Sequence, residues 1–267
     1  MKLVDTAGLV SSSFRTLPRF RVVRAASLAD AVGALAAADR PAVLAGGTDL
    51  PARFNEGFSP DVLVDVSRID ALWTIEISDG ALAIGAAVTH AEGARHPLIV
   101  ERLPSFGRAW SRIANVRVRM SATLGGNLMA RRTRYEGAIL LSALAARLRF
   151  ETQHGQTDVA VEQIWSQAIP PRGLLTTILI PLRAGLVLDY ERSLRPIMTQ
   201  AVAIDAIGAG RVVTATEHVV PRVQEVSGGA VAPSPAQIFG DPVTGDAYLQ
   251  RVSAVFLQRQ LQRTRAA

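Results

Sequence analysis

Two pairs of adjacent glycines, each beside hydroxyl or amide side chains, have the composition of phosphate-binding segments. The first lies in Leu44-Ala45-Gly46-Gly47-Thr48-Asp49-Leu50 and the second in Thr123-Leu124-Gly125-Gly126-Asn127-Leu128. Glycines directly after a strand let the backbone approach a ligand, and successive N–H groups in such a loop form a concave anion site. A single Gly-Gly is more often a plain turn. Two such loops that converge would hold a diphosphate without any lysine.

Other catalytic signatures are missing from the sequence. It contains no phosphate-binding P-loop, no Gly-x-Gly-x-x-Gly, no His-Glu-x-x-His and no Gly-x-Ser-x-Gly. The four histidines, His90, His96, His154 and His218, stand apart from one another and are interpreted as surface or core residues. Because the chain has no cysteine, it offers no disulfide, thiol nucleophile or cysteine-bound cluster. We therefore nominate no catalytic side chain and no metal ligand.

Bulk composition narrows the function classes. The formal net charge is +6, but the arginines are scattered and aromatic residues make up only 5%, which disfavours nucleic-acid binding. The most apolar segment, Gly137 to Ala146, is far shorter than the roughly 20 residues of a membrane span. The first residues lack the features of a signal peptide. We therefore expect no transmembrane segment, and the absence of cysteine is consistent with a cytoplasmic protein.

Local patterns predict a mixture of helices and strands. Ser27 to Ala38 has a capping residue and helical spacing, and Asp79-Gly80 has the residues of a tight hairpin turn within Thr74 to Gly85. Further helices are predicted over Pro97 to about Ile113, Gly137 to Ala146 and Asp246 to Leu261. Further strands are predicted over Ala42 to Ala45, which we interpret as buried, over Asp61 to Val66 and over Ile178 to Leu182. A Pro- and Gly-rich loop is predicted from Ser227 to Asp246. Without a regular alternation of helix and strand, the fold class is α+β.

The two glycine pairs, in this order, resemble the paired signatures of the FAD-binding (medium) subunit of the xanthine dehydrogenase and carbon monoxide dehydrogenase family of molybdenum hydroxylases. Roughly residues 20 to 260 are similar to the family pattern. The supporting segments are Arg24 to Ala31, Ile84 to His90, Val118-Arg119, Leu174 to Pro181 and Tyr248 to Gln260.

The resemblance implies an α+β fold: a two-lobed FAD-binding domain of the vanillyl-alcohol oxidase-like (PCMH) type, followed by a small C-terminal α/β domain. An N-terminal extension would cover residues 1–18. The FAD-binding domain would cover 19–185, with lobes of about 19–72 and 73–185. The C-terminal domain would cover 186–267.

The resemblance also implies positions for a cofactor site. Residues Leu44, Ala45, Gly46, Gly47, Thr48, Asp49 and Leu50 would wrap the diphosphate. Ile113 and Ala114 would lie near the adenosine and diphosphate. The segment around the second glycine pair would contact the cofactor through Thr123, Gly125, Gly126 and Asn127. Glu136 stands where the family usually has an aspartate. Leu174 and Leu175 would pack beside the isoalloxazine, and Arg192 or Arg195 would replace a lysine near the ring.

One segment departs from the family pattern. Arg131-Arg132-Thr133-Arg134 stands where the family usually has small residues and a proline, and Met120 stands where asparagine is common. The arginines could strengthen diphosphate binding through charge-assisted hydrogen bonds, or they could face a partner.

The implied function is electron transfer. FAD in this chain would take electrons from [2Fe-2S] clusters on a small subunit and pass them to an external acceptor. A large subunit would carry the molybdenum cofactor, and the heterotrimer would itself dimerise. Two alternatives are a scaffold subunit that has lost FAD and a stand-alone flavin oxidoreductase.

Overall fold

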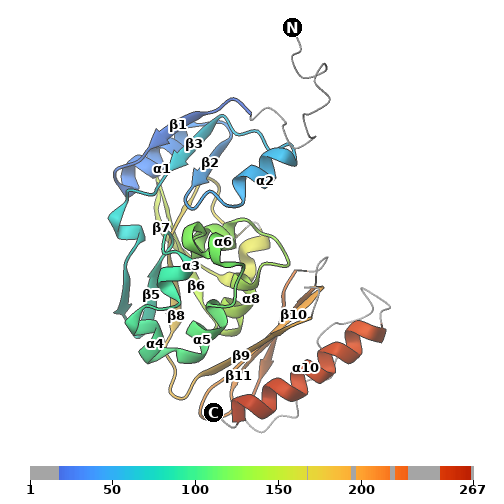
Figure 1. Cartoon of the computed structure of the whole chain (residues 1–267). Helices are drawn as coiled ribbons and strands as arrows, with labels where there is room; N and C mark the ends of the chain where they lie inside the picture. Colours follow the sequence, from blue (N-terminus) through green and yellow to red (C-terminus); the bar gives the residue numbers. More distant parts are fainter. Residues whose placement is uncertain (1–17, 167, 194–196, 217–219, 228–246, 266–267) are drawn as a thin grey trace.

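Three sheets follow one another along the chain, and each forms a separate part of the molecule (Figure 1). The computed structural model describes residues 18–166, 168–193, 197–216, 220–227 and 247–265. Residues 1–17 of the expected N-terminal extension, most of the predicted Ser227 to Asp246 loop, Arg195 and His218 lie outside these residues.

The first part is a small lobe with a three-stranded parallel sheet. It contains β1 (Arg21–Arg24), α1 (Leu28–Ala37), β2 (Pro41–Leu44), α2 (Leu50–Asn55) and β3 (Val62–Asp65), with β3 in the centre. The predicted first helix is confirmed: the Ser27 hydroxyl accepts a hydrogen bond from the Asp30 N–H at 3.1 Å. The prediction that β2 is buried was wrong. It is an edge strand without a fully buried residue, and Val43 is exposed because it borders the cavities beside the strand.

The second part is built on a five-stranded antiparallel sheet. Its elements are η1 (Asp70–Leu72), β4 (Ile75–Ser78), β5 (Ala81–Gly85), β6 (Arg147–Thr152), β7 (Gly155–Ala160), η2 (Val161–Trp165) and β8 (Leu174–Pro181). Strand β8 lies in the middle, between β5 and β6. The predicted hairpin is confirmed, since Asp79 and Gly80 have φ of 50° and 73° at the turn between β4 and β5.

Six short helices lie between β5 and β6. They are α3 (His90–Gly93), α4 (Pro97–Arg102), α5 (Pro104–Trp110), α6 (Val116–Ser121), α7 (Leu124–Met129) and α8 (Glu136–Ala143). The single helix predicted from Pro97 to Ile113 was wrong. It breaks at Leu103 (φ −139°, ψ 59°), because Pro104 lacks an N–H and disfavours helical backbone in the preceding residue. Helix α8 is buried along its whole length, which explains its unbroken apolar sequence.

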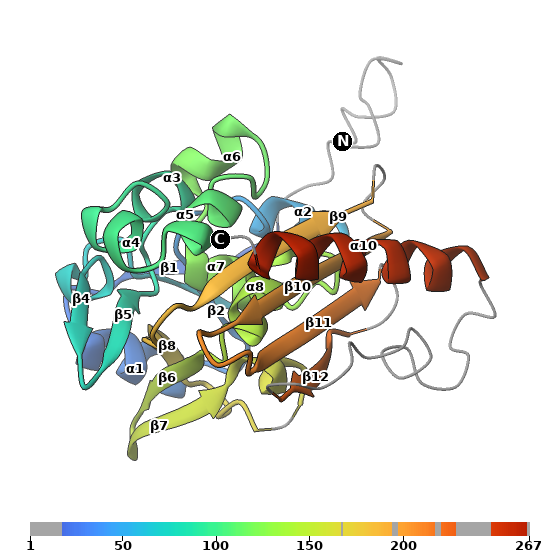
Figure 2. The ribbon, with the colours of Figure 1, turned by 90° about the horizontal axis from the view of Figure 1, so that it is seen from below.

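The third part is a four-stranded antiparallel sheet with one long helix. The strands are β9 (Val187–Arg192), β10 (Met198–Ile204), β11 (Gly210–Thr216) and β12 (Arg222–Val226), and the helix is α10 (Ala247–Arg265). Helices α5 and α8 contact this sheet, and α10 lies across it as well. Figures 1 and 2 show α10 on the outer face of the sheet, away from α8. The sheet is therefore enclosed between the second part and α10.

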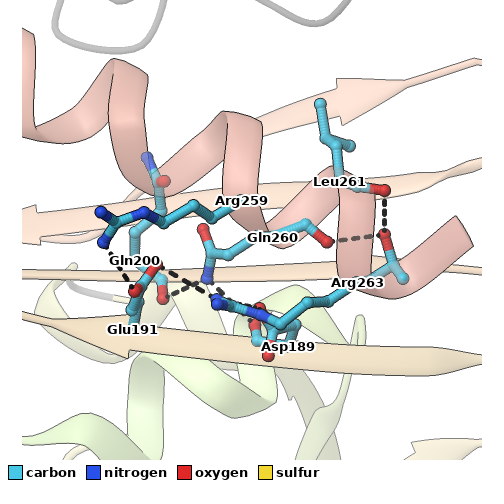
Figure 3. Close-up of polar contacts among 8 residues, drawn as sticks. Asp189, Glu191, Gln200, Arg259, Gln260, Leu261 and Arg263 are labelled. Carbon is cyan, nitrogen blue, oxygen red and sulfur yellow. Dashed lines mark hydrogen bonds and ion pairs between the residues drawn. The ribbon is translucent and has the colours of Figure 1, made fainter. Parts of the chain in front are cut away.

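Polar contacts fix α10 to the strands beneath it (Figure 3). The Gln260 side-chain amide donates to the backbone oxygens of Gln200 at 3.0 Å and Asp189 at 3.3 Å. Arg263 forms ion pairs with Asp189 at 2.7 Å and Glu191 at 3.1 Å. In the part of the chain that the structure describes, no helix has both the length and the apolarity needed to cross a bilayer.

Candidate functional site

A cavity of about 800 Å³ lies where the small lobe, the helical segment around α6 and α7, and the start of β8 meet. The expected site residues all line it except Leu44. Leu44 ends β2, and its backbone oxygen accepts from the Val66 N–H at 3.0 Å. Arg192 reaches the cavity from β9, so all three parts of the molecule contribute to its wall.

The first glycine pair forms an open loop between β2 and α2. Among the described residues, no hydrogen bond uses the backbone N–H groups from Gly46 to Leu50. Gly47 has φ of +66°, a conformation that residues with a Cβ rarely adopt. A Cβ on Gly46 would collide with the backbone carbonyl of Ser121, so this glycine is needed for close packing of two chain segments. The loop thus presents unused donors to the cavity.

The second glycine pair is not a loop, which corrects the expectation. Gly125 and Gly126 lie in the first turn of α7, and their N–H groups donate to the Ala86 oxygen and the Thr123 hydroxyl at 3.0 Å each. A Cβ on Gly125 would lie 2.7 Å from the Ala86 oxygen. Gly125 therefore lets α7 pack closely on the chain after β5, and Thr123 serves as the N-cap of α7. Gly126 is exposed and lines the cavity.

Asn127 contributes a polar side chain to the same wall. It is half-buried, and its Oδ1 is buried without a hydrogen-bond partner in the described part of the chain. The side chain packs on Gly137, where any Cβ would collide with it. A buried acceptor left without a donor costs free energy, so this position fits a ligand that can donate.

Four side chains, Asp49, Glu56, Arg132 and Tyr135, form a cluster that we call the Asp49 clasp. Asp49 Oδ1 accepts from Arg132 Nε and from the Tyr135 hydroxyl, both at 2.9 Å. Arg132 also pairs with Glu56 at 3.0 Å. Burial and the Asp49 carboxylate raise the pKa of the Tyr135 hydroxyl, so it remains a donor. Arg132 thus pairs with carboxylates of its own chain, whereas Arg131 and Arg134 line the cavity.

A second cluster joins the helical segment to the C-terminal sheet. Glu136, at the start of α8, is 8% exposed and accepts from Arg192 at 2.8 Å and from the Tyr190 hydroxyl at 3.2 Å. Burial and the nearby Glu136 carboxylate raise the pKa of Tyr190, which keeps its proton. The sequence pointed separately to Glu136 and Arg192 but not to their pairing. Tyr190 was missed, although it lies two residues before Arg192 and therefore on the same face of β9.

Other wall residues were also missed. Val66, Leu72 and Ala87 line the cavity with apolar groups and pack in one cluster with Leu174, and His90 lines the same cavity. His90 is 1% exposed, which agrees with its interpretation as a core residue. No group of three or more potential metal-ligating side chains occurs within the described ranges.

The cavity fits a dinucleotide in size and in lining. Its volume is within the range of roughly 300 to 1,000 Å³ for small-molecule sites. One wall offers the free N–H groups of the Gly46 to Leu50 loop, which suit an anion. Another wall offers Leu174 and Leu175, both buried, which suit a flat apolar group. The arrangement suits binding and orientation of a ligand rather than side-chain acid–base chemistry.

Comparison with known sequences gives consistent relatives. A family model described as "FAD binding domain in molybdopterin dehydrogenase" matches residues 18–183. The nicotinate dehydrogenase FAD-subunit of Eubacterium barkeri is 25% identical, over 73% of this chain and 68% of that protein. The 6-hydroxypseudooxynicotine dehydrogenase complex subunit alpha of Paenarthrobacter nicotinovorans is 30% identical, over 61% and 57%. For the latter protein, the matched stretch is thus less than two thirds of its length.

Comparison with solved structures supports the fold. A chain of carbon monoxide dehydrogenase from Hydrogenophaga pseudoflava superposes with a TM-score of 0.82 at 22% identity, covering 94% of this chain and 99% of that one. A chain of quinoline 2-oxidoreductase from Pseudomonas putida 86 gives 0.81 at 21% identity, covering 94% and 98%. The expected fold class, a two-lobed α+β domain followed by a small C-terminal domain, is confirmed. In this chain the C-terminal sheet is antiparallel.

Proposed function

The chain belongs to the family of FAD-binding domains of molybdopterin dehydrogenases, and on that premise we propose that it binds FAD in the cavity between its small lobe and β8 and transfers electrons within a larger complex. The family resemblance and the assignment as an oxidoreductase subunit are confirmed by the comparisons. The electron-transfer role and the residue assignments belong to the proposal.

The observation that carries the proposal is the set of unused N–H groups in the Gly46 to Leu50 loop. In the proposed complex these groups donate to the diphosphate. Ile113 and Ala114 flank the same cavity, where the adenosine would lie, and Asn127 binds from α7. Because the N–H groups of Gly125 and Gly126 are used inside the protein, the second glycine pair shapes the wall and does not supply the main anion donors.

The other end of the cavity holds the isoalloxazine in this proposal. Leu174 and Leu175 pack against the ring and exclude water. The Glu136 carboxylate, held by Arg192 and Tyr190, accepts from a hydroxyl of the bound ligand. FAD, when bound, supplies the capacity to accept two electrons and to release them singly. The side chains therefore bind, orient and shield the cofactor.

The partners follow from the family chemistry. We assign the molybdenum cofactor to a large subunit and [2Fe-2S] clusters to a small one, since this chain has no cysteine to bind a cluster. The relatives include proteins named as a medium subunit and a medium chain of larger enzymes. A dimerised heterotrimer and a cytoplasmic location remain predictions from the sequence.

A scaffold that has lost FAD is the main rival. The arginine-rich segment Arg131 to Arg134, which raised this alternative, does not fill the cavity. The open cavity with free donors therefore favours the cofactor-binding function.

The test is the flavin content of the full chain purified from its native complex. We expect non-covalent FAD that acid precipitation releases into the supernatant, identified by chromatography. Gly126→Leu should abolish FAD retention, because Gly126 lines the cavity and the leucine side chain would occupy space next to the wall. The atom that the new Cβ would approach is the Thr123 hydroxyl oxygen. Gly33→Leu is the matched control, since a Cβ there meets nothing within 4 Å.

The partner assignment has its own test. A tagged chain isolated from native cells should bring down one large molybdenum-containing subunit and one small iron–sulfur subunit in equal amounts. FMN, a flavin that stays with the precipitate, or a flavin-free complex would contradict FAD binding. A flavin-loaded monomer that oxidises a small substrate alone would favour the stand-alone enzyme.

A further inference from the structure

The Gly46 to Leu50 loop has little backbone support of its own. Within the described chain, its N–H groups make no hydrogen bond. Only its end is part of a helix, since Asp49 is the N-cap of α2 and its backbone oxygen accepts from the Arg53 N–H at 3.1 Å. Gly46 rests on the backbone of Ser121 and Ala122 at one end. An anion site depends on donors that already point the right way before the ligand arrives. A side-chain contact at the other end would add to the support that the start of α2 gives the loop.

The Asp49 clasp supplies that support. The Asp49 carboxylate, at the end of the loop, takes two hydrogen bonds of 2.9 Å from Arg132 and Tyr135, which follow α7 far along the chain. The ion pair is mostly shielded, with 23% of the Arg132 side chain and 17% of the Asp49 side chain exposed. Charge-assisted hydrogen bonds in such surroundings are stronger and more directional than neutral ones. The loop is thus tied to the opposite side of the cavity.

The clasp also neutralises negative charge next to the unused N–H groups of the loop. Asp49 lines the cavity, and Glu56 is the C-cap of α2 and pairs with the same arginine. Two uncompensated carboxylates here would repel a phosphate. Arg132 contacts both carboxylates, and their hydrogen bonds to its guanidinium raise its pKa, so it stays charged. One arginine therefore orients the loop and removes the repulsion.

We propose that Arg132 and Tyr135 are positioning residues for the dinucleotide: acting through Asp49, they hold the Gly46 to Leu50 loop with its N–H groups towards the ligand diphosphate. This inference rests on the proposed FAD function. It gives the arginine-rich segment a role inside the chain, distinct from a direct phosphate contact and from a partner surface. Arg132 touches Asp49 and Glu56 and is not a residue of the cavity wall, so it acts on the ligand indirectly. Tyr135 lines the cavity, and its hydroxyl donates to Asp49, which is the contact assigned to it here.

The experiment measures FAD release from the purified complex. Flavin fluorescence, which recovers when FAD leaves the protein, gives the release rate after dilution. Arg132→Met should release FAD about tenfold faster, the order expected when a charge-assisted hydrogen bond is lost. Tyr135→Phe should act in the same direction but less, because Arg132 still holds Asp49. The double variant should show less than the product of the two effects, since both act through one carboxylate.

Three further variants separate positioning from general stability. Arg132→Lys should restore part of the retention, because it returns the positive charge without the forked geometry. In the Arg132→Met background, Asp49→Asn should also slow release by removing the repulsion. Arg149→Met is the control: Arg149 pairs with Asp158 at 2.9 Å on the β6–β7 hairpin, away from the cavity wall. Its release rate should equal that of the wild type.

The outcomes are distinct. Unchanged release in Arg132→Met, or equal acceleration in Arg149→Met, overturns the positioning role while FAD binding stands. Acceleration in Arg132→Met that neither Arg132→Lys nor Asp49→Asn reduces also overturns it, because both changes restore part of the charge balance at Asp49 on which the positioning role depends. A wild-type complex without flavin overturns the proposed function, and this inference falls with it.

Discussion

At the scale of single residues, the hydrogen bond from Trp110 to His90 fixes the protonation of a histidine in the cavity wall. The indole Nε1 can only donate, so His90 Nδ1 is the acceptor at 2.6 Å and the proton of the neutral ring is on Nε2. Burial and, to a lesser degree, the nearby Arg119 charge lower the pKa of His90 to about 4. His90 is therefore neutral at physiological pH.

The lowered pKa of His90 predicts a pH dependence of stability. The unfolded chain binds a proton near pH 6.5 and the folded chain only near pH 4, so the stabilising contribution is complete above pH 6.5 and is lost as pH falls towards 4. We expect the free energy of unfolding to fall by about 2 kcal/mol more between pH 7 and pH 5 in the wild type than in His90→Asn.

Urea unfolding of the flavin-free chain at both pH values measures this difference. Asparagine keeps an acceptor for Trp110 but does not titrate. His154→Asn is the control, since His154 lies in the exposed turn between β6 and β7. Equal pH dependence in wild type and His90→Asn would contradict a neutral, buried His90.

The residues of the site were more predictable than their roles. Residue types alone identified both glycine pairs, and the family resemblance added further positions that line the cavity, such as Ile113, Leu174 and Arg192. The sequence could not show that Gly46 and Gly125 face the chain's own backbone, because Ser121 and Ala86 are distant in sequence. The Asp49–Arg132 pair was hidden for the same reason. Non-local packing decides which group each side chain meets.

At the scale of elements, strong local signals predicted structure well. The capped α1 and the Asp79-Gly80 hairpin carry their signals within a few residues. The errors occurred where tertiary contacts or a proline decided the outcome. Pro104 split one predicted helix into α4 and α5, and α7 formed although glycines disfavour helices. Its N–H groups are satisfied by Val88, Ala86 and Thr123, which stabilise the first turn.

The packing of α7 gives an element-scale prediction. Gly125→Ala should destabilise the flavin-free chain by roughly 2 kcal/mol or more, because its Cβ would press on the Ala86 backbone and side chain. Gly33→Ala, within α1 and with open space around the new Cβ, should stabilise by about 0.5–1 kcal/mol through helix propensity. Thermal unfolding of both variants without flavin measures the difference. Equal stability of the two variants would show that α7 is not packed this closely.

At the scale of the whole molecule, the C-terminal sheet lies between the cavity-lining part of the protein and the final helix α10. Its inner face contacts α5 and α8, and Tyr190 and Arg192 of β9 hold Glu136 in the cavity wall. Its outer face is covered by α10 (Figure 2). The sequence indicated the final helix but not this enclosure, because strand order and layer position depend on pairings between distant residues.

The polar fixation of α10 gives a whole-molecule prediction. Gln260→Ala should lower the free energy of unfolding by roughly 2 kcal/mol, since it leaves the backbone oxygens of Asp189 and Gln200 without the donor that α10 supplies. Gln262→Ala, at an exposed position of the same helix, should change it by less than about 0.5 kcal/mol. Urea unfolding measures the free energy of unfolding of both variants. A similar loss in the two would show that Gln260 does not anchor the helix.

The positions of the cavity-lining residues along the sequence determine when the cavity can be completed during synthesis. Wall residues begin at Pro41 in β2 and end at Arg192 in β9. Synthesis proceeds from the N-terminus, so the small lobe and α7 leave the ribosome before β9 exists. Until then the Glu136 carboxylate lacks the guanidinium that pairs with it. If the cavity binds FAD as proposed, the cofactor can be enclosed only late in translation or in the finished chain, and a chain that ends before Arg192 would lack one wall of the cavity.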